Sequence, residues 1–251
     1  MVELREYKTN YKDVPIILGI PGLVHAGEET RIDKILKELN KRKINGVRMN
    51  FSGIEKKADS IECNFNLDRY VEDISKAFKL ISQESEKVGI ITSSMASGIF
   101  SYFMSQNPAN ISSLVSISPA AGWPYYASSS VRKNLENNPR NLEITSLGDQ
   151  DKGIKRIITK EGLLELIKTD GLEALRKSYQ PTQMKVLTLA GKDDRISDYA
   201  SMREYHRLLG GEPERFLEYE SGHNIYLELC KDAIGEFLRN TLYKKNDRKV
   251  A

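Results

Sequence analysis

Short apolar runs alternate with amphipathic stretches along most of the chain. The apolar runs have the length of buried strands, and glycine, proline or serine directly follows several of them. The predicted strands cover residues 14–20, 44–51, 88–92, 111–118, 184–190 and 215–219. Because segments with helical periodicity separate these runs, the pattern predicts the α/β class, with a mostly parallel sheet flanked by helices.

The separating segments carry apolar residues every three or four positions, as amphipathic helices do. Ile32, Leu36 and Leu39, for example, fall on one helical face. The predicted helices cover residues 28–43, 66–86, 95–105, 198–209 and 225–242. Each of these helices is expected to bury its apolar face against the sheet.

The stretch from Trp123 to Gln183 interrupts the alternation. It has no strand signals, and its leucine and isoleucine positions follow a helical pattern. A stretch of roughly sixty residues is far longer than a connection between neighbouring elements needs. We therefore expect a helical cap at 123–183, inserted into a core domain formed by 1–122 and 184–251. A long crossover with one helix is the alternative.

Composition and charge exclude several classes of function. The chain is 39% hydrophobic and 29% charged, as ordinary globular proteins are. A net charge of +3 over 251 residues is too small to indicate a nucleic-acid surface. The sequence has no phosphate-binding glycine loop, and its three histidines lack metal-ligand spacing. We therefore expect no metal, no cofactor and no nucleic-acid partner.

Two further features bear on where in the cell the protein is expected. Cys63 and Cys230 are far apart and form neither a disulfide framework nor a zinc motif, and Cys230 is expected to be a buried thiol. No apolar run is long enough to span a membrane, and the charged first residues contain no signal peptide. We expect a cytoplasmic protein.

A candidate nucleophile lies where a predicted strand passes directly into a helix. In a nucleophile elbow, a sharp turn raises one side chain above the sheet edge, and the residues two before and two after it must be small. For Ser94 these residues are Thr92 and Ala96, whereas Ser93 would be flanked by bulky side chains. Glycine is expected at both positions, so Thr92 is a clear departure. A serine-rich helix N-cap is the alternative interpretation.

A carboxylate and a histidine follow two later strands. Asp193 and Asp194 come directly after one strand, and His223 follows the last one after a glycine. A catalytic histidine needs a carboxylate that fixes its tautomer, and the carboxyl ends of parallel strands meet at one sheet edge. His206 lies inside a predicted helix and is expected to be at the surface or partly packed. His25 lies in a loop near the site. Because both aspartates directly follow the strand, their position leaves Asp193 and Asp194 as candidates for the catalytic carboxylate.

The order serine, aspartate, histidine, each after a strand, resembles the α/β-hydrolase family over nearly the whole chain. Residues 21–23 (PGL) are similar to the family's His-Gly-aromatic turn, with proline in place of histidine. Residues 48–53 (RMNFSG) resemble the family's rFDfrGhG segment, with asparagine for aspartate. Residues 191–194 (GKDD) resemble its G-x-x-D segment, which favours Asp194 over Asp193, and residues 221–224 (SGHN) resemble its sGHn segment.

This resemblance implies an α/β-hydrolase fold with a helical cap, and a catalytic triad of Ser94, Asp194 and His223. The backbone N–H groups of Leu23 and Met95 would form the oxyanion hole. The cap would shape the substrate pocket, with ordinary cap packing as the alternative for its aromatic residues. The candidate substrate-binding residues are His25, Trp123, Tyr125 and Tyr126.

Three functions are compatible with these residues. The first is a carboxylic ester hydrolase, similar to the capped feruloyl esterases and monoacylglycerol lipases. The second is a thioesterase or acyltransferase acting on acyl-CoA or an acyl carrier protein, because residues 89–97 (GIITSSMAS) are similar to the elbow of the acyl-carrier thioesterase of bacterial luminescence. The third is a binding protein that kept the fold without activity, which the altered elbow motivates.

Overall fold

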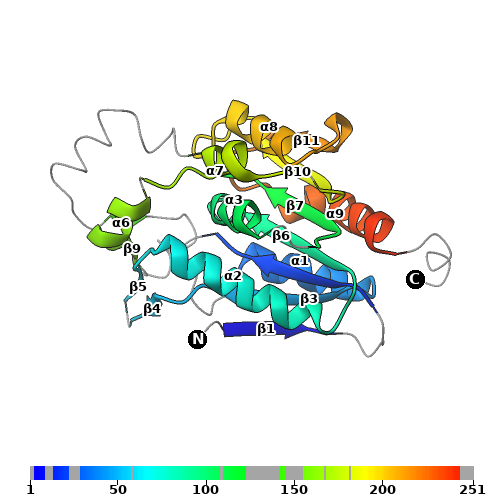
Figure 1. Ribbon diagram of the computed structural model, residues 1–251, viewed down its shortest axis with the longest axis horizontal. Coiled ribbons are helices and arrows are strands. Elements are labelled where there is room, and N and C mark those ends of the chain that lie inside the picture. The colour runs from blue at the N-terminus through cyan, green and yellow to red at the C-terminus, as the bar shows by residue number, and fades with distance from the viewer. Residues whose placement is uncertain are drawn as a thin grey trace.

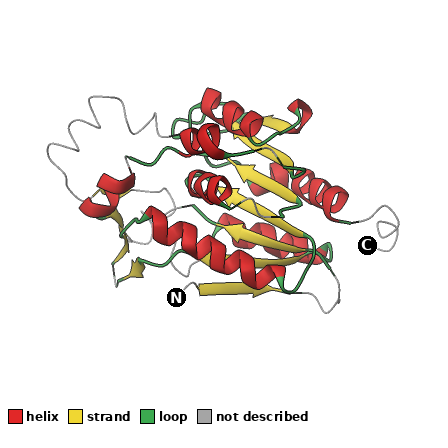
Figure 2. Cartoon of the chain, viewed as in Figure 1, coloured by secondary structure: helices red, strands yellow, loops and turns green. Residues whose placement is uncertain are grey.

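The structure is a computed structural model of the 251-residue chain. It describes residues 3–8, 14–22, 29–57, 59–107, 110–122, 142–144, 155–166, 168–180 and 182–243. Two sheets, one large and one small, organise these residues (Figures 1 and 2).

The larger sheet has seven strands in the order β1-β3-β2-β6-β7-β10-β11. Their bounds are β1 Glu3–Tyr7, β2 Ile16–Ile20, β3 Asn45–Asn50, β6 Val88–Ser93, β7 Ser113–Ile117, β10 Lys185–Gly191 and β11 Phe216–Tyr219. Strand β1 pairs antiparallel with β3, and all other pairs are parallel. All six predicted strands are present, which confirms the mostly parallel sheet. Strand β1 was not predicted because it is a charged edge strand with no buried apolar run.

Helices cover both faces of this sheet, as predicted (Figure 1). One buried cluster joins the sheet to α2 (Leu67–Ser82), α3 (Ala96–Gln106) and α8 (Tyr199–Leu208). A second cluster joins the opposite face to α1 (Arg31–Lys41) and α9 (Leu227–Leu242). A short helix, Pro213–Arg215, leads into β11. The strands between the two clusters are buried on both sides, which explains their continuous apolar runs.

Helix α1 is fixed at its first turn by a buried carboxylate. Thr30 caps the helix, and the Asp33 carboxylate accepts a hydrogen bond from the Thr30 backbone N–H, which makes a capping box. Asp33 also forms an ion pair of 2.7 Å with Arg48 of β3, and both side chains are almost fully buried. Tyr7 of β1 donates to the same carboxylate. One aspartate therefore joins the edge strand, the neighbouring strand and the helix.

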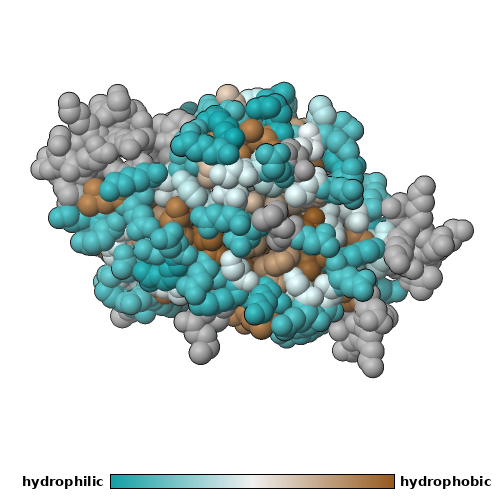
Figure 3. All heavy atoms as spheres, viewed as in Figure 1, coloured by the Kyte–Doolittle hydropathy of each residue, from teal (hydrophilic) through white to brown (hydrophobic). Residues whose placement is uncertain are grey.

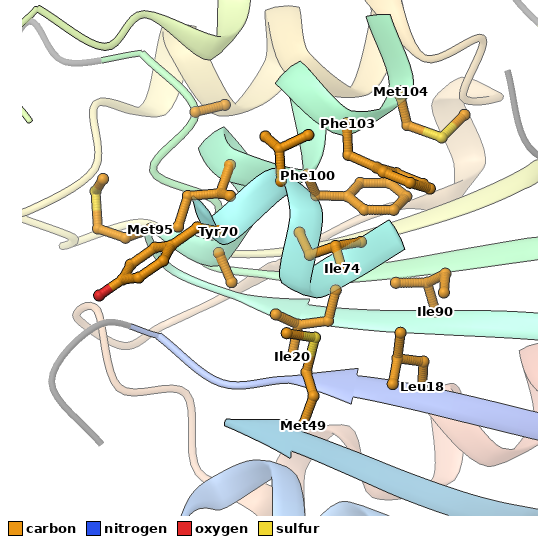
Figure 4. Close-up of a cluster of buried hydrophobic side chains, with 14 of the residues drawn as sticks. Leu18, Ile20, Met49, Tyr70, Ile74, Ile90, Met95, Phe100, Phe103 and Met104 are labelled. Atoms are coloured by element: carbon orange, nitrogen blue, oxygen red, sulfur yellow. The ribbon is translucent and has the colours of Figure 1, made fainter. Parts of the chain in front are cut away.

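The first cluster includes the buried face of the helix that follows the candidate nucleophile. Figure 4 shows Met95, Phe100 and Phe103 from this part of the chain among side chains of α2 and the sheet. Phe100 and Phe103 pack with ring centroids 5.8 Å apart. Helix α3 is mostly buried for this reason, and its position over β6 and β7 is fixed by packing.

The segment predicted as a helical cap contains both helices and strands. Its helices are α6 (Lys160–Leu166) and α7 (Gly171–Ser178), and its strands are β8 (Leu142–Ile144) and β9 (Lys155–Ile158). The two strands join β4 (Ile54–Lys56) and β5 (Ser60–Cys63) in a sheet of order β4-β5-β9-β8. Strands of three or four residues are too short to show an alternating pattern, which is why they were not predicted.

Helix α7 packs directly on α3. The Gly171 N–H donates to the Ala121 carbonyl over 2.8 Å, and a side chain at position 171 would lie only 2.8 Å from the Gly98 carbonyl oxygen. Glu165 of α6 accepts from the Leu67 N–H at the start of α2 over 2.6 Å. The described helices of the insertion are thus attached to the core helices. The boundary at 123–183 stays a prediction.

The face of the molecule that Figure 3 shows is covered mainly by hydrophilic residues, with hydrophobic residues visible between them. Many charged side chains pair along or between helices, as Arg176 does with Glu204 over 2.8 Å. Among the helices that the structure describes, none is both long enough and apolar enough to cross a membrane.

Candidate active site

Ser94 lies in a sharp turn between β6 and α3. The strand ends at Ser93 and the helix begins at Ala96, so only two residues make the connection. The φ angle of Ser94 is 53°, in the left-handed region that non-glycine residues rarely adopt. The Ser94 N–H donates to the Ile117 carbonyl over 3.0 Å, and its own carbonyl accepts from Ala120 N–H over 3.1 Å. This is the strained strand–turn–helix geometry that the sequence predicts for an elbow.

Thr92, the clearest departure from a small residue, is accommodated by a buried set of hydroxyl groups. Its Oγ1 lies 2.9 Å from Ser97 Oγ and 3.0 Å from Ser116 Oγ. Ser116 Oγ is in turn 3.2 Å from the hydroxyl of Tyr205. Burial raises the pKa of Tyr205 to about 12, so this hydroxyl keeps its proton. The elbow therefore closes around a hydrogen-bonded threonine instead of a glycine.

His223 lies between Ser94 and Asp194. Its Nε2 is 2.8 Å from Ser94 Oγ, and its Nδ1 is 2.8 Å from Asp194 Oδ2. A carboxylate accepts only, so Nδ1 carries the proton and Nε2 is free to accept from the Ser94 hydroxyl. The imidazole is mostly buried, with 15% of the side chain exposed. Three residues from distant parts of the sequence thus form one hydrogen-bonded chain.

The structure brings Asp194, and not Asp193, to the histidine. The Asp194 side chain is 1% exposed, and its second oxygen, Oδ1, accepts from the N–H groups of Ile196 and Ser197 over 2.8 and 2.9 Å. Asp193 is exposed, and its backbone N–H donates to the Ser221 carbonyl. Of the two aspartates, only Asp194 has a carboxylate held on both oxygens.

His206 belongs to the core and not to this site, and the expectation that it is at the surface or partly packed is wrong. It is 4% exposed. Its Nδ1 is 2.9 Å from Thr188 Oγ1, and its Nε2 donates to the Glu212 carbonyl over 2.9 Å. Burial lowers the pKa of His206, so the neutral form is favoured. The helical pattern placed it on α8 correctly but did not show which face it occupies.

Of the two backbone groups predicted to form an oxyanion hole, one lies within the described chain. Met95 N–H is at the start of α3, where helix N–H groups carry partial positive charge, and it has no acceptor among the described residues. A side chain on Gly22 would lie 3.4 Å from Ser94 Cβ, so this turn passes beside the serine. Leu23, His25, Trp123, Tyr125 and Tyr126 lie outside the described residues.

Ser118 was not predicted as part of the site. It directly follows β7, its φ angle is 46°, and its Oγ donates to the His223 carbonyl over 2.8 Å. The only sequence signal is a serine and a proline at a strand end, which many turns share.

The described part of the candidate site brings together one histidine and one aspartate. Within the described ranges, no group of three or more histidine, cysteine or acidic side chains is arranged to hold a metal ion. Cys63 and Cys230 are both buried thiols, and the Cys63 Sγ lies 3.3 Å from the Tyr70 hydroxyl. Burial raises the pKa of the Cys230 thiol, as expected for a structural cysteine.

The chain was compared with protein families and with solved structures. The family model Hydrolase_4, described as serine aminopeptidase, S33, matches residues 16–229. No curated protein sequence matches the chain significantly.

Similar solved structures include Est1E from Butyrivibrio proteoclasticus with bound ferulic acid. It has 16% identity and a TM-score of 0.74 over 97% of this chain and 96% of that one. A soluble variant of monoglyceride lipase from Saccharomyces cerevisiae, in complex with a substrate analogue, has 12% identity and a TM-score of 0.73 over 96% and 92%. The monoacylglycerol lipase of Paleococcus ferrophilus has 17% identity and a TM-score of 0.67 over 95% and 98%. At such identities the likeness concerns the fold, and the predicted α/β-hydrolase fold is confirmed.

Proposed function

The chain belongs to the serine aminopeptidase S33 family of α/β-hydrolases, and from this premise we propose that it is a serine hydrolase that cleaves carboxylic esters. One observation carries the proposal: the His223 imidazole is 2.8 Å from both Ser94 Oγ and Asp194 Oδ2, and Ser94 has the strained φ of an elbow. Esterase and lipase structures with this fold support the choice of an ester bond.

The proposed reaction has two steps. Ser94 Oγ attacks the ester carbonyl carbon while its proton moves to His223 Nε2, which then gives that proton to the leaving alcohol. Water next loses a proton to the same nitrogen and attacks the acyl-enzyme, which releases the acid and restores the serine. Asp194 keeps the imidazole in the required tautomer and stabilises its charged form. Its second oxygen is already bonded to two backbone N–H groups, so the carboxylate has little freedom to turn.

Negative charge on the carbonyl oxygen would be stabilised by the N–H groups of Met95 and Leu23. Met95 N–H lies at the N-terminus of α3, where the helix dipole also favours an anion. Each such donor contributes roughly 10²- to 10³-fold to turnover in related chemistry. Because both are backbone groups, substitution of the two side chains is expected to affect this role little.

A thioester substrate is the second candidate. The observation that favours it is the elbow, residues 89–97, which is similar in sequence to an acyl-carrier thioesterase and uses Thr92 where glycine is usual. The acyl group would then come from acyl-CoA or an acyl carrier protein. Ester and thioester share the attack of Ser94 and differ in the leaving group, so a matched panel separates them.

The test measures hydrolysis of p-nitrophenyl esters and of acyl-CoA thioesters with equal acyl chain length. An aminoacyl p-nitroanilide tests hydrolysis of an amide bond. We expect Ser94→Ala to lower ester turnover by several powers of ten. Ser93→Ala, a neighbouring serine with the same chemical change, is expected to keep it within about threefold, because surface and strand-end changes away from the reacting atoms have small effects. Equal turnover by the wild type and Ser94→Ala would rule out the proposed nucleophile, and preference for the thioester or the anilide would replace the ester assignment.

A further inference from the structure

One short segment at the end of β7 contacts the backbone of Ser94, the backbone of His223 and the strand that leads to Asp194. Ile117 accepts from the Ser94 N–H, and Ala120 donates to the Ser94 carbonyl. Between them, the Ser118 N–H donates over 2.8 Å to Leu189 of β10, the strand that leads to Asp194. The Ser118 hydroxyl donates over 2.8 Å to the His223 carbonyl.

Ser118 is held in an unfavourable conformation at this point. Among the described residues, three that are not glycine have a positive φ, and two of them are Ser94 and Ser118. Pro119 follows Ser118, and a proline further restricts the residue before it. Such strain costs roughly 1–3 kcal/mol and persists only where surrounding contacts enforce it, most often at functional sites. The turn at Ser118 is therefore specified by its contacts and not by local preference.

We propose that Ser118 is a positioning residue, whose hydroxyl fixes the His223 backbone so that the imidazole stays in line between Ser94 and Asp194. This inference rests on the proposed function and extends it to a residue that does not touch the substrate. The physical reason is the position of His223 in a loop between β11 and α9, where no ladder hydrogen bond restrains its carbonyl. Ser118 is almost fully buried, so water does not easily replace its hydroxyl as the donor to the His223 carbonyl.

Two variants separate the hydroxyl from the backbone strain. Ser118→Ala removes the hydroxyl and keeps the strained φ, whereas Ser118→Gly removes the hydroxyl and relieves the strain. If the hydroxyl positions His223, both variants lose about ten- to a hundredfold in kcat with an unchanged KM, because small displacements of a catalytic group cost that much. Ser118→Gly should keep an unfolding midpoint close to that of the wild type. Ser101→Ala is the control, since it also removes a buried hydroxyl bonded to a backbone carbonyl over 2.8 Å.

A second measurement does not depend on turnover. The chain has only three histidines, so ¹⁵N-histidine labelling gives a simple imidazole spectrum. We expect the His223 Nδ1–H signal to be sharp and protected in the wild type and in Ser101→Ala, and to broaden through exchange in both Ser118 variants while the His206 signals stay unchanged. If the wild type hydrolyses no ester, the proposed function fails and this spectrum still decides the role of Ser118. A wild-type spectrum and wild-type kcat in Ser118→Gly would overturn the proposal.

Discussion

At the scale of single residues, the tautomer of His223 decides whether Ser94 can act as a nucleophile. Asp194 accepts from Nδ1 and leaves Nε2 free, which is the arrangement a general base needs. The sequence favoured Ser94 as the candidate nucleophile because of the small residues around it, and His223 as the candidate base because of its glycine turn. The position after a strand did not distinguish Asp193 from Asp194. Which of the two side chains reaches His223 depends on the turn after Gly191.

Asp194→Asn tests this arrangement. An asparagine can offer an N–H to Nδ1, which favours the wrong tautomer and leaves Nε2 protonated. We expect kcat to fall roughly 10⁴-fold while the fold is retained. Asp193→Asn makes the same chemical change one residue earlier, on an exposed side chain, and should keep kcat within about threefold. A larger effect from Asp193→Asn than from Asp194→Asn, in steady-state ester hydrolysis, would contradict the geometry.

His206 predicts a pH dependence of stability. Its pKa is lowered in the folded state because of burial, while the unfolded chain has the ordinary value of about 6.5. Above that pH both states are neutral at this residue. As the pH falls below it, the unfolded state takes up the proton first, so the free energy of unfolding decreases until the folded pKa is reached.

The measurement is urea unfolding at pH 8 and pH 5.5 for the wild type and His206→Gln. We expect the wild type to lose more stability between the two values than the variant does, because the variant lacks the titrating group. The other ionisable groups are the same in both proteins and contribute to both alike. An equal loss in both would show that His206 does not contribute.

At the scale of elements, the elbow depends on four pieces of structure meeting at Thr92. Strand β6, helix α3, strand β7 and helix α8 each supply one hydroxyl to the buried set, which consists of Thr92, Ser97, Ser116 and Tyr205. The sequence showed that Thr92 was unusual for an elbow. It could not show why threonine is tolerated, because the hydrogen-bond partners lie on other elements. Ser97 and Ser116 are 5 and 24 residues away from Thr92, and Tyr205 is farther still.

Thr92→Val tests this set of hydroxyl groups. Valine keeps the branched shape but leaves the partner hydroxyls of Ser97 and Ser116 with one bond fewer in a dry interior. We expect a loss of about 1–3 kcal/mol in the free energy of unfolding, measured by urea titration. Thr241→Val on α9 is the matched control, since that hydroxyl is only partly buried and bonds to a carbonyl of its own helix. Its expected effect is within about 0.5 kcal/mol. No loss in Thr92→Val would mean that shape alone keeps the elbow closed.

At the scale of the whole molecule, strand order explains how the site assembles. Strands β6, β7, β10 and β11 are neighbours in the sheet, and parallel pairing puts their carboxyl ends at one edge (Figure 1). The alternation of apolar runs and helical segments was enough to predict this architecture. It did not predict the small sheet β4-β5-β9-β8. The central pair of this sheet joins β5 to β9, which is far away in the sequence, and its short strands carry little local signal.

The most direct test of the proposed function is to find where a serine-reactive probe attaches. A fluorophosphonate reacts only with a serine that a neighbouring base activates, so labelling reports the working triad and not the fold alone. We expect the wild type to carry one adduct, which peptide mapping by mass spectrometry places on Ser94, and Ser94→Ala to carry none. Full labelling of folded Ser94→Ala, or no labelling of the folded wild type, would contradict the assignment of Ser94, His223 and Asp194 as a catalytic triad.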